Sequence, residues 1–110
     1  DIKTDGLTKD GVLNIIRKHY RSDKINVVLS HQPLYFDDIA DRFDVIMLSG
    51  HIHNGQIFPF VLFVRLMYNY IYGEYRRNSS VLYVTSGAGT WGPPMRFLST
   101  SEVPVIDVYY

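Results

Sequence analysis

The chain has 110 residues, enough for one domain or for a piece of a larger one. A hydrophobic content of 46% predicts a packed globular core, and a formal net charge of zero gives no field to draw nucleic acid or an acidic membrane surface. Without cysteine, the chain excludes disulfides, thiolate metal sites and a cysteine nucleophile.

The first predicted element is an amphipathic helix over residues 9–20. Thr8 is a suitable N-cap, and Asp10 lies in the first turn, where negative charge is favourable. Apolar side chains recur at helical spacing, at Val12, Leu13, Ile16 and Tyr20. Arg17, Lys18 and His19 would then lie in the last turn, opposite the negative end of the helix dipole.

Two apolar runs follow, and each leads into a histidine. Residues 25–30 predict a central strand that ends at His31, and residues 44–48 predict a strand that leads to His51. A short helix is expected between them, over residues 36–43. Strand, crossover helix and strand indicate a parallel pair, so both histidines should lie at the carboxyl edge of one sheet, where open α/β sheets bind ligands.

The C-terminal half predicts less regular structure. Residues 57–72 are rich in aromatic and aliphatic side chains but too short to span a bilayer, so they should be buried or interfacial. Residues 75–80 suggest a polar turn, in which Asn78, Ser79 and Ser80 also match a glycosylation sequon. A third strand is expected over residues 81–85, a glycine-proline loop over 86–94, and a last strand over 102–110, with Pro104 indicating an edge.

Residues 49–56, S-G-H-I-H-N-G-Q, hold the most informative motif. In an extended segment His51 and His53 point the same way, about 6.6 Å apart at roughly 3.3 Å per residue. This spacing suits one metal held by both rings, or two metals about 3.5–4 Å apart with one ring on each. The flanking glycines let the backbone turn sharply beside a bound group.

Gly87, Gly89 and Gly92 match the dinucleotide-binding pattern G-x-G-x-x-G, with Asp107 about 20 residues further on. The last glycine is followed by two prolines and by no helical pattern, so the context does not fit that motif. The segment is better interpreted as a loop at a sheet edge. The remaining alternative is that the backbone N–H groups of this loop line the same site as the histidines.

Three motifs together resemble the calcineurin-like metallophosphoesterase family, especially its bacterial branch that is tethered to or exported across the membrane. They are His31-Gln32-Pro33, the 49–56 motif, and the run Tyr83 to Gly89 with Arg96. The resemblance implies a four-layer α/β/β/α sandwich with two divalent ions (Mn, Fe or Zn) at the strand ends. It implies His31 and His51 on one metal and His53 on the other, sharing a hydroxide that attacks a phosphate mono- or diester. It also suggests that Gln56 and Arg96 support the substrate.

The chain lacks the family's earlier motifs D-x-H, G-D and G-N-H-[DE], which carry the remaining ligands. Residues 1–110 are therefore expected to be the C-terminal part of the domain, without its N-terminal half, with no catalytic residue of their own and inactive alone. Strand faces that the other half would cover should favour self-association. The alternative is a non-catalytic module that binds a membrane or a protein through residues 57–72. The location stays open between membrane-associated, exported and cytoplasmic.

Overall fold

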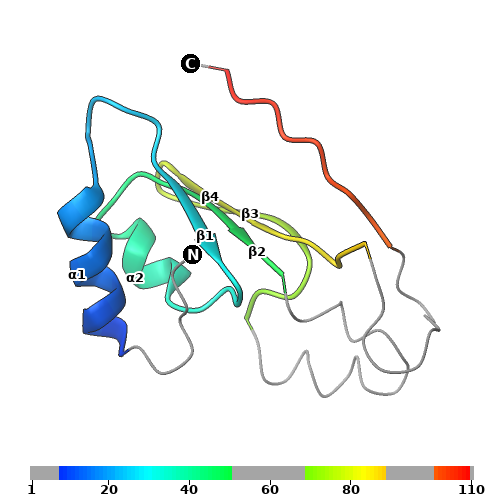
Figure 1. The fold of residues 1–110 in the computed structure, drawn as a ribbon, viewed down its shortest axis with the longest axis horizontal. Helices are drawn as coiled ribbons and strands as arrows, with labels where there is room; N and C mark the ends of the chain where they lie inside the picture. The colour runs from blue at the N-terminus through cyan, green and yellow to red at the C-terminus, as the bar shows by residue number, and fades with distance from the viewer. Residues whose placement is uncertain (1–7, 51–68, 89–100, 110) are drawn as a thin grey trace.

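The computed structural model describes residues 8–50, 69–88 and 101–109. Its elements are α1 (Lys9–His19), β1 (Val27–Ser30), α2 (Phe36–Ala40), β2 (Ile46–Ser49), β3 (Gly73–Arg77) and β4 (Ser80–Val84). The strands form one sheet in the order β1-β2-β4-β3, with β1, β2 and β4 parallel and β3 antiparallel to β4. Figure 1 shows α1 and α2 together on one side of this sheet. The predicted α/β class and the parallel β1–β2 pair are confirmed.

Helix α1 forms for the reasons that its sequence indicates. The Thr8 side chain accepts a hydrogen bond from the Gly11 amide at 3.3 Å, which caps the first turn. Val12, Leu13 and Ile16 are the buried residues of the helix. They pack against buried residues of α2, of the α2–β2 connection and of the sheet, which form one core: Val28, Phe36, Ile39, Ala40, Phe43, Val45, Met47, Leu82 and Val84. One apolar face of the sheet is thus covered by both helices.

The first strand begins later than predicted and lies elsewhere in the sheet. The Asn26 side chain accepts from the Arg21 amide and donates to the Arg21 and Lys24 carbonyls, which folds the preceding residues into a loop. β1 therefore starts at Val27, and it forms an edge of the described sheet instead of its centre. Its outward side chains Val27 and Leu29 are 54% and 57% exposed, so its apolar sequence does not reflect burial on both faces within this chain.

Helix α2, which connects β1 to β2, is also shorter than expected. α2 ends at Ala40, because the amides of Arg42 and Phe43 both turn back to the Ile39 carbonyl. β2 then runs from Ile46 to Ser49, two residues later than predicted at its start. The connection is held by Ser80, whose buried hydroxyl accepts from the Val45 amide at 3.0 Å and donates to the Phe43 carbonyl at 2.8 Å.

The polar turn predicted over residues 75–80 is mostly strand. β3 pairs with β4 from Gly73↔Val84 to Arg77↔Ser80, which leaves only Asn78 and Ser79 as the hairpin turn. Asn78 adopts a left-handed backbone with φ of 52°, a conformation that asparagine tolerates. Its side-chain amide donates to the Ala40 carbonyl at 3.1 Å and to Asp41 at 3.2 Å, so in the folded chain the sequon is engaged in internal contacts.

The predicted last strand is wrong within the described residues. Residues 101–109 form neither strand nor helix, and Figure 1 shows them running away from the sheet toward the C-terminus. Val103 and Val105 are 79% and 87% exposed. Pro104 between them has no amide to donate to a neighbouring strand. The alternation of apolar residues in this segment therefore finds no sheet face within the described part of the chain.

The β3–β4 hairpin is joined to α2 and to the residue that follows it near the start of β4. Arg77 forms two hydrogen bonds with the Asp41 carboxylate, at 2.8 Å and 2.9 Å. The Tyr70 hydroxyl donates to Asp37 at 2.5 Å, and its ring packs edge-on against Phe36. Burial of the phenol, followed by its bond to Asp37, raises the pKa of Tyr70 to about 12.

Candidate metal site at the carboxyl edge of the sheet

The carboxyl ends of three parallel strands meet at one edge of the sheet. Ser30 is in register with Ser49, and Ser49 is in register with Val84. The segments that follow β1, β2 and β4 therefore begin side by side with His31, Gly50 and Thr85. In Figure 1 the three strands leave the sheet at this common edge. This is the position at which α/β sheets collect ligand-binding side chains.

Backbone hydrogen bonds continue across this edge beyond the strands. The Gly50 amide donates to the His31 carbonyl at 3.3 Å, and the Thr85 amide donates to the Ser49 carbonyl at 2.8 Å. A Cβ atom on Gly50 would lie 3.4 Å from Cγ2 of Thr85, at van der Waals contact, so the two segments run close together. The residue that precedes His51 is thus held directly between His31 and the segment after β4.

The His31 segment is shaped by its neighbours. The Ser30 hydroxyl donates to the Gln32 carbonyl at 2.7 Å, and the buried Pro33 ends the strand. The His31 side chain is exposed at the edge. The sequence prediction that His31 lies beside the start of the 49–56 motif agrees with this backbone. His51, His53, Gln56 and Arg96 lie outside the described residues, as does most of the aromatic segment 57–72.

A buried hydroxyl marks the same edge. Ser49 is 4% exposed, and its Oγ has no hydrogen-bond partner among the described residues. Buried polar atoms without partners are rare, and each calls for an explanation such as a bound ion, a water molecule or a functional role. Within residues 8–50, 69–88 and 101–109, no three His, Asp or Glu side chains gather as a metal-binding group. The described residues thus contribute one imidazole to this edge, which suits a softer divalent ion such as Zn²⁺ better than Mg²⁺.

Sequence reasoning missed one carboxylate at this edge, that of Glu102. Its Oε1 atom accepts from the Ser86 amide at 3.1 Å and from the Tyr83 hydroxyl at 3.3 Å, and its Oε2 atom accepts from the Tyr72 hydroxyl at 2.8 Å. Burial acts to raise the pKa of Glu102, but these bonds outweigh it and lower the pKa. A single acidic residue opening an apolar run was the only signal, and the partners come from three separate segments.

The glycine pattern that suggested a dinucleotide site is only partly described. Gly87 has a φ of 77°, and its amide donates to the Thr85 hydroxyl at 3.0 Å. Gly89 and Gly92 lie outside the described residues, and Asp107 lies in the extended segment 101–109, which contains no helix. The first part of the loop therefore makes internal bonds at the same edge as His31.

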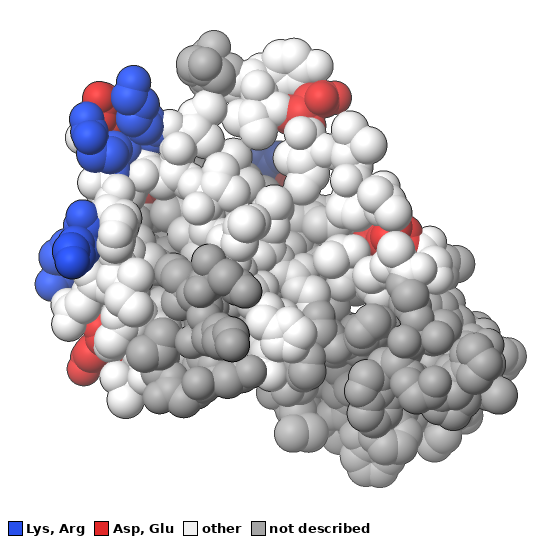
Figure 2. Space-filling view, viewed as in Figure 1, with Lys and Arg blue, Asp and Glu red and all other residues white. Residues whose placement is uncertain are grey.

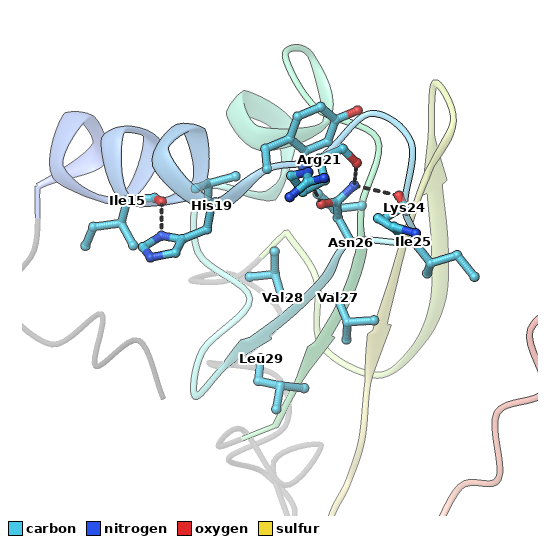
Figure 3. A pocket seen from close by; sticks show the side chains of 12 residues that line it. Ile15, His19, Arg21, Lys24, Ile25, Asn26, Val27, Val28 and Leu29 are labelled. Carbon is cyan, nitrogen blue, oxygen red and sulfur yellow. Dashed lines mark hydrogen bonds between the residues drawn. The ribbon is translucent and has the colours of Figure 1, made fainter.

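A separate hollow of about 520 Å³ lies between the end of α1, the following loop and β1. Figure 3 shows its lining, with Ile15 and His19 from the helix and Val27 and Leu29 from the strand. His19 forms a 2.9 Å hydrogen bond to the Ile15 carbonyl through Nδ1, which gives it a role within its own helix. In Figure 2, most of the Lys and Arg side chains visible in this view gather at the left side, and most of the remaining described surface is uncharged.

Comparison with known proteins finds relatives that are named metallophosphoesterases. The chain is 44% identical over 84 residues to an uncharacterized metallophosphoesterase of Helicobacter pylori strain J99, covering 74% of this chain and 23% of that protein. It is 41% identical over 98 residues to an uncharacterized metallophosphoesterase of Campylobacter jejuni, covering 84% of this chain and 25% of that protein. The chain thus spans about a quarter of the length of these relatives.

A vertebrate relative, from Danio rerio, is named a transmembrane protein with a metallophosphoesterase domain; it is 40% identical over 80 residues, which are 70% of this chain and 18% of that protein. Within the part of this chain that the structure describes, no helix has the length and apolar character to cross a membrane. No family model and no solved structure matches the chain. Because its relatives are 31–44% identical over most of its length and are all named for a metallophosphoesterase, the chain belongs to the calcineurin-like metallophosphoesterase family.

Proposed function

We propose that this chain supplies the imidazole ligands of a two-metal site in a protein that hydrolyses phosphate monoesters or diesters. The observation that carries the proposal is the hydrogen bond from the Gly50 amide to the His31 carbonyl. This bond brings the start of the G-H-x-H motif beside a second histidine at the carboxyl edge. Membership of the metallophosphoesterase family supports a hydrolase dependent on divalent metal.

In this proposal His31, His51 and His53 bind the metals, and Gln56 and Arg96 contact the phosphate-ester substrate. Two divalent ions (Mn, Fe or Zn) would supply Lewis-acid activation and neutralise charge on the phosphoryl oxygens. An imidazole binds a metal only when it is neutral, so the affinity should fall below the usual histidine pKa of about 6.5.

The chain spans only about a quarter of the length of its relatives, so we propose that it is part of a longer protein of similar length. The remaining part of that longer protein would supply the carboxylate ligands that divalent ions also need. The outward face of β1, with Val27 and Leu29 more than half exposed, is the surface on which that part would pack. The 110 residues alone would then lack turnover and would tend to self-associate through this face. For the longer protein only, we propose either a membrane-associated location, which the name of the Danio rerio relative suggests, or an exported one.

The test is metal-dependent turnover of p-nitrophenyl phosphate and bis-p-nitrophenyl phosphate. The longer protein should hydrolyse at least one of them, and His31→Ala should lower kcat/KM by about 100-fold or more because a metal ligand is lost. His19→Ala, in an exposed histidine of α1, is the matched control and should leave turnover unchanged. Turnover by the 110 residues alone, or equal activity of the two variants, would refute the proposal.

A further inference from the structure

We infer that Glu102 is a positioning residue: its carboxylate clamps the segment after β4, and this segment holds the turn that leads into the histidine motif. The inference rests on the proposed function, because it treats the carboxyl edge as the site. Glu102 comes from the extended C-terminal segment, whereas its partners come from β4, from the segment before β3 and from the segment after β4.

The clamp has a backbone part and a side-chain part. The Glu102 amide donates to the Gly87 carbonyl at 3.0 Å, while its carboxylate accepts from the Ser86 amide at 3.1 Å. The chain around Glu102 therefore grips two successive residues of the segment after β4. The Thr85 hydroxyl accepts from the Gly87 amide at 3.0 Å, which adds a bond within the segment. Residues 85–87 are thereby held by Glu102 and by the hydrogen bond between Thr85 and Gly87.

Two hydrogen bonds transmit this restraint toward the histidines. The Thr85 amide donates to the Ser49 carbonyl at 2.8 Å, and the next amide along, that of Gly50, donates to the His31 carbonyl at 3.3 Å. The methyl group of Thr85 also limits the space beside Gly50, where a Cβ atom would lie 3.4 Å from it. Displacing Thr85 would therefore move the residue immediately before His51.

The hydrogen bonding of Glu102 favours positioning over metal binding. A carboxylate has about four lone-pair directions, and donors from Tyr72, Tyr83 and Ser86 occupy three of them. The bonds that hold the carboxylate lower its pKa, so it is ionised at neutral pH and accepts all of them. A metal at Glu102 would have to replace these donors, whereas a clamp needs each one.

Three variants separate the roles. Glu102→Ala removes every side-chain acceptor. Glu102→Gln keeps an oxygen for the Ser86 amide and presents an amide group that can donate to the Tyr72 hydroxyl oxygen, which rotates its own hydrogen away. Glu74→Gln is the matched control, because Glu74 is an exposed glutamate of β3 whose ion pair is with Arg76 of the same strand.

The first measurement is amide hydrogen exchange of the metal-free chain by NMR. Glu102→Ala should accelerate exchange by about tenfold or more at Ser86, because the lost bond is to a charged group. Thr85 and Gly50 should accelerate with it. Glu74→Gln should remain close to wild type, and Glu102→Gln should lie between wild type and Glu102→Ala, because it keeps the acceptor oxygen without the charge. Unchanged exchange at Ser86 would overturn the clamp, and a change at Ser86 that leaves Gly50 unaffected would overturn its connection to the histidine motif.

The second measurement is zinc content and turnover of the longer protein. Glu102→Ala should lower kcat/KM, and Glu102→Gln should restore most of it while keeping its zinc. Loss of zinc in Glu102→Gln to the extent seen in His31→Ala would identify Glu102 as a ligand and overturn the positioning role. If the wild-type protein neither binds metal nor turns over substrate, the proposed function fails, but the exchange measurement still decides whether Glu102 acts as the clamp.

Discussion

The buried hydroxyl of Ser80 offers a sharp test of how the sheet that carries the site is held. Ser80 is 1% exposed and bonds both the Val45 amide, at 3.0 Å, and the Phe43 carbonyl, at 2.8 Å. The next residue along β4 donates its amide to the Val45 carbonyl at 3.0 Å. Ser80→Ala would therefore leave a buried amide without its partner at the point where β2 and β4 begin to pair.

The loss should lie within the range measured for leaving one buried donor unsatisfied, about 1–3 kcal/mol of unfolding free energy. In a chain of this size, that corresponds to a fall in Tm of roughly 5–15 °C. Urea unfolding followed by far-UV circular dichroism gives the free energy directly. Ser79→Ala, at the adjacent exposed turn position, is the control and should change it by less than about 0.5 kcal/mol. Equal stability of the two variants would refute the reasoning.

Three further outcomes follow from the same contacts. In an ultraviolet absorbance titration, one tyrosine should ionise at about pH 12, and this ionisation should be absent in Tyr70→Phe. Because the pKa of Tyr70 is raised in the folded chain, its contribution to stability is present below pH 10 and is lost as the pH rises toward 12. The Arg77 guanidinium lowers the pKa of Asp41, so the stabilisation that this ion pair gives the fold is present above the ordinary carboxyl value of 3.8. The difference in Tm between wild type and Asp41→Asn should therefore narrow as the pH falls below 3.8, and a constant difference would contradict the role of the pair. Val27→Lys with Leu29→Lys should reduce self-association of the 110-residue chain in sedimentation velocity, whereas Ser22→Lys with Ser79→Lys should not; a wild-type chain that is monomeric at all concentrations would argue against the exposed face as its cause.

The parts of the fold that the sequence predicts well are those whose local pattern and tertiary packing agree. α1 has a cap, a buried stripe and a basic last turn, and each appears in the structure. The parallel β1–β2 pair follows from two apolar runs joined by a short helix. The position of His31 at the carboxyl edge follows from that pairing alone.

The failures have the opposite origin, since tertiary context decides them. β3 carries Glu74, Arg76 and Arg77 on exposed positions, so its sequence resembles a turn until β4 supplies the partner strand. Residues 102–109 alternate like a strand, yet they have no paired edge within the described residues. Glu102 could not be identified because the residues that surround it are distant in sequence and meet only in the folded chain.

The most direct test of the account is a Zn²⁺ titration of the longer protein with ¹⁵N-labelled histidine, followed by NMR on the ring nitrogens of His19, His31, His51 and His53. The account predicts that His31, His51 and His53 shift together at one Zn²⁺ ratio, while His19, bonded to the Ile15 carbonyl, keeps its resonances. A titration in which His31 does not move with the other two would contradict a shared metal site at the sheet edge.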